Sequence, residues 1–419
     1  MVTTSSPAVL RRLHPFVLGI AFLSTYYVAL LGPILPAIAG PLGGDALAIG
    51  LLFSTYSLAQ FLTAPVLGAL GDRYGRRIVL LFSVVGALVG FSIFTVGAAT
   101  GAGLWVLFTG WIIVGACDCW IATAFSYVAD TTRPGTRARF FAFLTAAIGS
   151  AFVVGPATSG FFSTLSPVMP LLVLLALLCA ALIWGYFSMP ESLPPAQRAT
   201  SLHAAQMNPL SALRDVLRFP QLRLLLLSYL MFWPSVIALS ANLPTLMAER
   251  AAWDTGRIAS LLVLYGALVV VVQLGVIPIL AQHFRAIHLA IAGAVLSVAA
   301  FAMLAAFTVS ASIPLVYLGV TLFGLGQPLV QTGITAATSE SVDARTQGRA
   351  QGAVAATMAL AQVVGPLVIG WLYQAAGPQV AYTVIVAQIV VAIALMLAAI
   401  PRLARAMDAQ RAMAAPHTA

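Results

Sequence analysis

The sequence predicts an all-α polytopic membrane protein, with twelve transmembrane helices in two pseudo-symmetric six-helix bundles. Three observations support this fold class: the composition, the length of the apolar stretches and an internal repeat. The chain has 419 residues, of which 61% are hydrophobic and 7% are charged, and its mean hydropathy is +1.02. A soluble protein is about 45–50% apolar and about 25% charged. This composition is too apolar for a water-exposed surface and suits a surface that faces lipid.

The apolar stretches have the length of membrane spans. A spanning helix needs about 20 mostly apolar residues, whereas the strands of a membrane barrel are shorter and alternate in polarity. The uniform apolar character of these stretches therefore predicts helices. The twelve predicted spans are 15–38, 46–70, 78–99, 103–129, 139–164, 168–189, 222–247, 257–281, 287–308, 312–337, 350–375 and 380–401.

The arginines predict the orientation. All 20 basic residues are arginines, and with these spans all but Arg250 and Arg257 fall on one side of the membrane. Positively charged loops stay in the cytoplasm, so this side is predicted to be cytoplasmic and to hold both termini. The net charge of +9 reflects this topology. Its spread over many short loops argues against a nucleic-acid partner.

A polar segment at 190–221 divides the spans six and six. The predicted organisation is an N-terminal bundle over 1–189, a cytoplasmic linker over 190–221, and a C-terminal bundle with its tail over 222–419. Within the linker, "NPLSALRDVLRF" predicts a short amphipathic helix. Asn208 would be its N-cap and Pro209 its first residue.

The two halves of the chain repeat each other. At an offset of 210 residues, "VVGPATSG" at 153–160 meets "VVGPLVIG" at 363–370, and Arg139 meets Arg349. Tyr56 in span two meets Tyr265 in span eight at an offset of 209. Because polar, Gly and Pro residues match as well, the similarity of the halves is not explained by coincidence among apolar residues. Two repeated six-helix halves are typical of a transporter with its site between them.

Enzyme and metal chemistry find little support. The cysteines Cys117, Cys119 and Cys179 lie in apolar stretches, and residues two apart on a helix point in different directions, so the C-x-C pair is interpreted as small buried residues. The histidines fall at span ends or in loops. We therefore expect no metal, no cofactor and no enzyme activity. No phosphate-binding loop is present, so the energy for transport must come from an ion gradient.

Asp118 is the one acidic residue predicted to lie deep in a span. A charge in the middle of a bilayer costs roughly 2.5–3.5 kcal/mol even on insertion scales. Such a carboxylate is suited to binding and releasing a proton, and protonation would compete with binding of a cationic substrate. The alternative is a neutral acid that is hydrogen-bonded to a neighbouring helix.

Three motifs resemble those of a known family. "GALGDRYGRR" at 68–77 matches the loop signature of the major facilitator superfamily at every fixed position. "GSAFVVGPATSG" at 149–160 resembles the antiporter motif of drug:proton exporters, with Ser159 in place of one glycine. "YVADTTRPGTRAR" at 127–139 resembles the tetracycline-exporter branch. The resemblance covers about residues 10–400.

The resemblance implies a cytoplasmic latch. Asp72 would contact the start of span eleven, and Arg73 or Arg76 would pair with Asp130, which would close the cytoplasmic side in the outward-facing state. The alternative is an ion-pair cluster that only fixes topology, worth about 0–1 kcal/mol per pair. The residues assigned to this latch are Gly68, Asp72, Arg73, Gly75, Arg76, Arg77 and Asp130.

The Gly-Pro motif in span five is expected to act as a hinge or as a tight helix contact against the opposite half. Ordinary helix packing is the alternative. The residues assigned to the motif are Gly149, Gly155, Pro156 and Gly160.

In this superfamily, spans one, four, seven and ten line the central site. Asp118 would share a helical face with Trp111 and Phe125. Relatives carry an arginine where this chain has Trp111, and the span-one carboxylate of several drug exporters is absent, so Asp118 is the candidate substitute. Aromatic and amide side chains suit an amphipathic ligand, although each could serve packing instead. The candidate cavity residues are Tyr26, Tyr27, Trp111, Phe125, Tyr229, Phe232, Trp233, Asn242, Gln327 and Gln331.

These observations predict a proton-coupled secondary transporter of the bacterial inner membrane. It would export small amphipathic, drug-like molecules by alternating access and act as a monomer, with multidrug efflux and antibiotic resistance as the expected outcome. Its partners would be the substrate, protons and the lipid bilayer. One alternative is export of an endogenous metabolite such as a siderophore, sugar or amino acid. A second alternative is a non-transporting membrane sensor, which would need a sizeable soluble domain.

Overall fold

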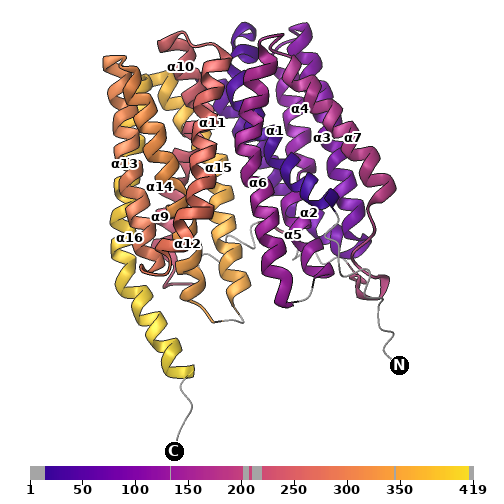
Figure 1. The fold of residues 1–419 in the computed structure, drawn as a ribbon, viewed down its shortest axis with the longest axis vertical. Helices are drawn as coiled ribbons and strands as arrows, with labels where there is room; N and C mark the ends of the chain where they lie inside the picture. The colour runs from indigo at the N-terminus through magenta and orange to yellow at the C-terminus, as the bar shows by residue number, and fades with distance from the viewer. Residues whose placement is uncertain (1–14, 133, 202–206, 210–218, 344–345, 415–419) are drawn as a thin grey trace, which may run out of the picture. The chain divides into compact units, whose positions relative to one another are not determined.

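The computed structural model describes residues 15–132, 134–201, 207–209, 219–343 and 346–414. The described chain is built from helices (Figure 1). The α-helices are α1 (Pro15–Ala39), α2 (Ala46–Tyr74), α3 (Arg76–Thr100), α4 (Leu104–Cys117), α5 (Trp120–Thr131), α6 (Pro134–Ser163), α7 (Met169–Ser188), α9 (Arg223–Ile237), α10 (Leu243–Ala251), α11 (Thr255–Val271), α12 (Ile277–Leu280), α13 (Ala286–Ser310), α14 (Ile313–Glu340), α15 (Gln347–Ala376) and α16 (Pro378–Ala414).

The described part of the chain contains twelve helical segments that are long and apolar enough to cross a membrane, which confirms the predicted fold class. Each overlaps one predicted span. Span four consists of α4 and α5, span seven of α9 and α10, and span eight of α11 and α12. The helices often continue past the predicted ends, and α16 continues to Ala414. Hydropathy marks where apolar surface stops, whereas a helix can continue into water.

The chain divides into two compact units. The first unit contains residues 1–43 and 55–209, and the second contains 44–54 and 210–419. The first nine residues of α2 therefore group with the second unit.

In the first unit, α1 packs against α5, α6 and α7, and α3 packs against α4 and α7. Large aromatic side chains fill the interior between these helices. Phe91, Trp111 and Trp120 are almost completely buried there. This aromatic interior surrounds Asp118, the one buried acid among the described residues.

In the second unit, α13 packs against α14 and α16, and α9 packs against α15 and α16. Two spans of this unit contain a π-helical turn, η4 (Ala238–Asn242) and η5 (Val272–Val276). Each turn lies just before a helix with a proline in its first turn, Pro244 in α10 and Pro278 in α12. Such turns occur frequently at functional sites.

The linker is described in part. Residues 195–197 form a short 3₁₀ turn, and the backbone amide of Ala199 donates to the carbonyl of Asp72 (2.9 Å). The predicted amphipathic helix that follows Asn208 lies mostly at 210–218, outside the described residues.

Candidate functional site

Span four is interrupted at Asp118. Helix α4 ends at Cys117 and α5 begins at Trp120, while Asp118 has extended backbone angles (φ −82°, ψ 101°). The backbone amide of Trp120 lies 3.4 Å from Asp118 Oδ1. Aspartate favours such local bonds to the backbone in competition with the helix. The expectation of one continuous helix over 103–129 was therefore wrong at this point.

The Asp118 carboxylate accepts hydrogen bonds from two tyrosines. The Tyr27 hydroxyl donates to Oδ2 at 2.6 Å, and the Tyr56 hydroxyl donates to the same oxygen. The two hydroxyl oxygens lie 3.3 Å apart. We call these three residues the carboxylate–tyrosine cluster. It joins spans one, two and four inside the first unit, and the side chain of Asp118 is only 5% exposed.

Aromatic rings enclose the carboxylate–tyrosine cluster. Trp111 stacks on Tyr56 with centroids 4.6 Å apart, and Trp120 meets Tyr27 edge-on at 5.8 Å. Gly115 lets the backbones of α4 and α2 approach closely, since a Cβ atom there would lie 2.4 Å from the carbonyl oxygen of Tyr56. The cluster is therefore held by close backbone packing and by ring contacts.

This arrangement suits reversible protonation. Oδ2 accepts from both hydroxyls, while the one contact of Oδ1 among the described residues is the long one to the Trp120 amide. Oδ1 is therefore the oxygen better placed to take a proton. Within the described residues Asp118 forms no ion pair with an arginine. Its ionised form is instead stabilised by neutral hydroxyl donors, which are present in both protonation states.

The interruption separates residues that were expected to share one face. Trp111 contacts both tyrosines of the cluster, with a 6.2 Å edge contact to Tyr27. Phe125 instead packs against Phe141 of α6, with centroids 5.1 Å apart. Trp111 and Phe125 therefore lie on two helices, on either side of the break at 118, and their shared face stays a prediction.

The other cavity candidate on α1 lies beside the cluster in sequence. Tyr26 is buried and stacks on Phe22 of the same helix, with ring centroids 5.3 Å apart. Its hydroxyl also interacts with the side chain of Thr158 on α6.

The remaining cavity candidates lie in the second unit. Tyr229 meets Trp233 edge-on at 5.3 Å, Phe232 stacks on Phe323, and Gln327 donates to Gln331 (3.0 Å). The indole nitrogen of Trp233 and both amide atoms of Asn242 are buried, with no hydrogen-bond partner in the described part of the chain. Asn242 ends the π turn η4. Buried polar groups usually have partners, so these atoms are available to a ligand or water.

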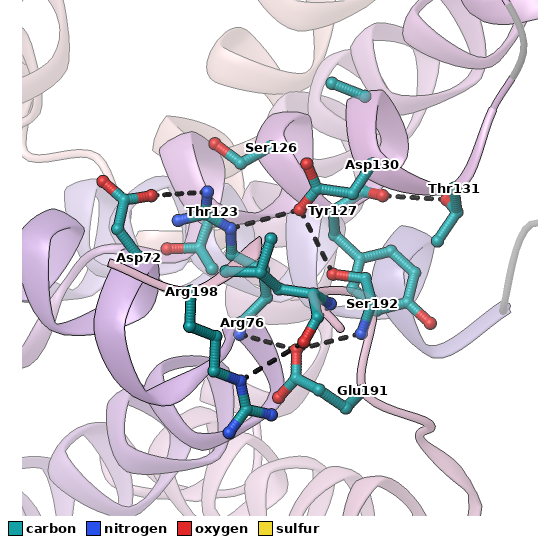
Figure 2. Close-up of polar contacts among 12 residues, drawn as sticks. Asp72, Arg76, Thr123, Ser126, Tyr127, Asp130, Thr131, Glu191, Ser192 and Arg198 are labelled. Atoms are coloured by element: carbon teal, nitrogen blue, oxygen red, sulfur yellow. Dashed lines mark hydrogen bonds and ion pairs between the residues drawn. The ribbon is translucent and has the colours of Figure 1, made fainter. Parts of the chain in front are cut away.

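The loop signature forms a polar cluster at the ends of α2, α3 and α5 (Figure 2). The Arg76 guanidinium lies 2.6 Å from Asp72 and 3.3 Å from Asp130. Arg76 is 13% exposed whereas Asp72 is 56% exposed, so the Asp72 carboxylate remains open to water. Of the two arginines considered for the pair with Asp130, the structure places Arg76 there.

Glu191 holds the start of α3, and sequence reasoning missed it. Its carboxylate accepts from the backbone amides of Arg76 (2.8 Å) and Arg77 (3.2 Å), which are free at a helix start. Gly75 has φ 111°, and a Cβ atom there would lie 2.1 Å from Glu191 Oε2. The only signal in the sequence is an acid directly after span six, and nothing local connects it to a helix more than a hundred residues away.

The other two arginines of the loop have different contacts. Arg73 lies over the Tyr74 ring at 5.4 Å, and Arg77 donates to the carbonyl of Tyr186 at 2.5 Å. Gly68 lies on α2 with open space around it. These contacts fasten the loop to its own unit.

The Gly-Pro motif lies on α6, which continues through Pro156 and also carries Gly149 and Gly160. At Gly155 a Cβ atom would lie 2.9 Å from Ala29 Cβ of α1. Ser159, which replaces a motif glycine, donates to the Leu30 carbonyl of α1 (2.5 Å). The motif therefore forms a tight contact between spans one and five of its own half, whereas the contact was expected with the opposite half.

Comparisons with known proteins agree with this architecture. The family model of the Major Facilitator Superfamily matches residues 17–308 and 276–418. The class C tetracycline resistance protein of Escherichia coli is 32% identical over 364 residues, which are 86% of this chain and 89% of that protein. The class E protein of Escherichia coli is 28% identical over 375 residues, covering 87% and 89%.

A solved structure shows the same fold. The crystal structure of the human organic anion transporter MFSD10 has a TM-score of 0.68 and 22% identity, and the match covers 92% of this chain and 100% of that one. Helix count, internal repeat and family match lead to one conclusion. The chain belongs to the major facilitator superfamily of membrane transporters and is related to tetracycline efflux proteins.

Proposed function

We propose that this transporter exports small amphipathic molecules in exchange for protons, by alternating access, from the bacterial inner membrane. The observation that carries the proposal is the carboxylate–tyrosine cluster, a buried acid at a break in a membrane span. Interrupted spans form ion and substrate sites in transporters. An ionisable group inside the membrane costs free energy, so such groups are rare and usually mark a functional site. The tetracycline resistance proteins among its relatives support a drug-like substrate.

We propose Asp118 as the proton carrier. Because no arginine of the described residues pairs with it, the acid can change charge without leaving a buried cation unpaired. The hydroxyls of Tyr27 and Tyr56 would stabilise the ionised form after the proton leaves. Substrate binding would then be linked to proton release through the surrounding rings.

We propose that the aromatic and amide residues of spans one, four, seven and ten contact the substrate. Trp233 and Asn242 have the strongest support, because their polar atoms are buried without protein partners in the described residues. A ligand with both an aromatic face and hydrogen-bonding groups would satisfy them.

The Asp72–Arg76–Asp130 contacts support the proposal of a cytoplasmic latch. In this proposal the exposed Asp72 carboxylate meets the start of span eleven in the outward-facing state. Rocking of the bundles then separates them. The same scheme places the arginine-rich loops and both termini in the cytoplasm, with a monomer as the working unit.

Transport into inverted proteoliposomes tests the function. The protein is reconstituted with an imposed pH gradient and offered tetracycline, cationic dyes, neutral drugs, sugars and amino acids. Proton-driven accumulation of a drug-like compound, lost in Asp118→Asn and kept in Asp45→Asn, is the expected result. Asp45 is a suitable control because it caps Ala48 at a helix start, and asparagine can also cap. Accumulation of only sugars or amino acids would favour metabolite export, and drug uptake that ignores the pH gradient would contradict proton coupling.

A further inference from the structure

Three arginines of the second unit line an open hollow of about 470 Å³. Arg223 is the first residue of α9, and Arg402 and Arg405 lie on α16, the yellow helix of Figure 1. Pro220 and Gln221 complete the lining. We call this feature the arginine hollow.

The arginine hollow lies at a membrane boundary. Arg223 begins the apolar segment of span seven and Arg405 ends that of span twelve. Helices α9 and α16 pack against each other, so the two boundaries are brought side by side within one unit. Lipid headgroups occupy this depth in a bilayer.

Arg402 and Arg405 give the arginine hollow a positive charge. None of its lining residues is acidic, and Arg402 and Arg405 form no ion pair with a carboxylate within the described residues. The contrast is Arg76, which pairs with two carboxylates. The N-terminus of α9, a helix of 15 residues, adds its dipole and free amides on the same side.

We propose that the arginine hollow binds the phosphate group of an anionic phospholipid headgroup from the surrounding leaflet. Guanidinium groups present paired N–H donors that match phosphate oxygens, and basic pockets between membrane helices bind acidic lipid headgroups. The volume accommodates a headgroup, and the depth favours a lipid over a soluble anion. This site is separate from the carboxylate–tyrosine cluster and does not depend on the proposed export function.

Lipid binding to the full-length protein tests the proposal. Purified protein in a neutral detergent is titrated with phosphatidylglycerol or phosphatidylcholine, and bound lipid is counted by native mass spectrometry. The parent is expected to bind phosphatidylglycerol preferentially, and the double variant Arg402→Gln/Arg405→Gln to bind it at least about tenfold more weakly. The control Arg139→Gln/Arg285→Gln removes the same charge from exposed arginines elsewhere and is expected to bind as the parent does.

Four outcomes decide the proposal. Equal phosphatidylglycerol binding by the parent and the Arg402/Arg405 double variant would overturn it, as would an equal loss in the control. In a second experiment, inorganic phosphate is added as a competitor of the lipid. Competition by phosphate only at concentrations far above those of the lipid supports a lipid site. Tight phosphate binding without any lipid preference would overturn the lipid assignment. Size-exclusion profiles of all variants establish that they are folded.

Discussion

At the scale of single residues, the buried acid depends on two hydroxyl donors. Tyr27 and Tyr56 both donate to Oδ2 of Asp118, and all three side chains are buried. A hydrogen bond to a charged group is worth about 1.5–3 kcal/mol. The two tyrosine hydroxyls therefore offset part of the free-energy cost of ionising this carboxylate away from water.

Tyr56→Phe removes one donor and leaves the ring in place. We expect proton-driven transport to fall by about tenfold or more, because the ionised carboxylate loses a charge-assisted hydrogen bond. Transport in proteoliposomes measures this. The matched control is Tyr265→Phe, since Tyr265 occupies the repeated position and stacks on Phe323 without an acid at its hydroxyl. Equal rates in the two variants would contradict the role of Tyr56.

Gly75→Ala tests the start of α3. The added methyl group would have a positive φ and would collide with the Glu191 carboxylate, so we expect a loss of about 1–3 kcal/mol in the free energy of unfolding. Thermal unfolding in detergent measures it. Gly68→Ala is the control, because Gly68 is helical with open space around it and should tolerate the change. A normal unfolding temperature for Gly75→Ala would show that Glu191 does not hold α3 in this way.

At the scale of elements, the interruption of span four distinguishes the two halves. The position 209 residues after Asp118 is Gln327, which lies in the unbroken helix α14. Gln327 donates to Gln331 on the same helix, whereas Asp118 binds groups from two other spans. The two halves therefore share the span but not the acid. We expect proton binding and release in the first half.

Gly155→Ala tests the contact between spans one and five. The new Cβ atom would lie 2.9 Å from Ala29 Cβ and 3.0 Å from the Leu30 amide nitrogen, so α6 must shift away from α1. We expect a loss of about 1–3 kcal/mol in stability, together with reduced transport. Gly352→Ala, in α15 with open space around it, is the control for thermal unfolding and transport. Unchanged stability and transport in Gly155→Ala would show that the motif tolerates looser packing.

At the scale of the whole molecule, the sequence was sufficient for the span number and fold class. Long apolar runs identify membrane helices because lipid offers no hydrogen bonds to an open backbone. The break at Asp118 and the partner role of Tyr56 could not be predicted, because they depend on contacts between spans distant in sequence. Glu191 was missed for the same reason. The π turns likewise lie in segments whose hydropathy resembles that of regular helix.

The orientation of the chain in the membrane is a prediction at the scale of the whole molecule. With the native cysteines replaced, single cysteines at Thr164 and Ala196 should lie on opposite sides of the membrane. We expect a membrane-impermeant maleimide to label Thr164→Cys in intact cells and Ala196→Cys only in inverted vesicles, because the arginine-rich side is cytoplasmic. Labelling of Ala196→Cys in intact cells would overturn the predicted orientation.

The central claim is that Asp118 carries the proton. Its most direct test is proton release on substrate binding, recorded in weakly buffered detergent solution with a transported drug-like compound. The parent should release protons as substrate binds, and Asp118→Asn should bind substrate with no release. Equal proton release from both proteins would place the proton site elsewhere and leave Asp118 as a hydrogen-bonded neutral acid.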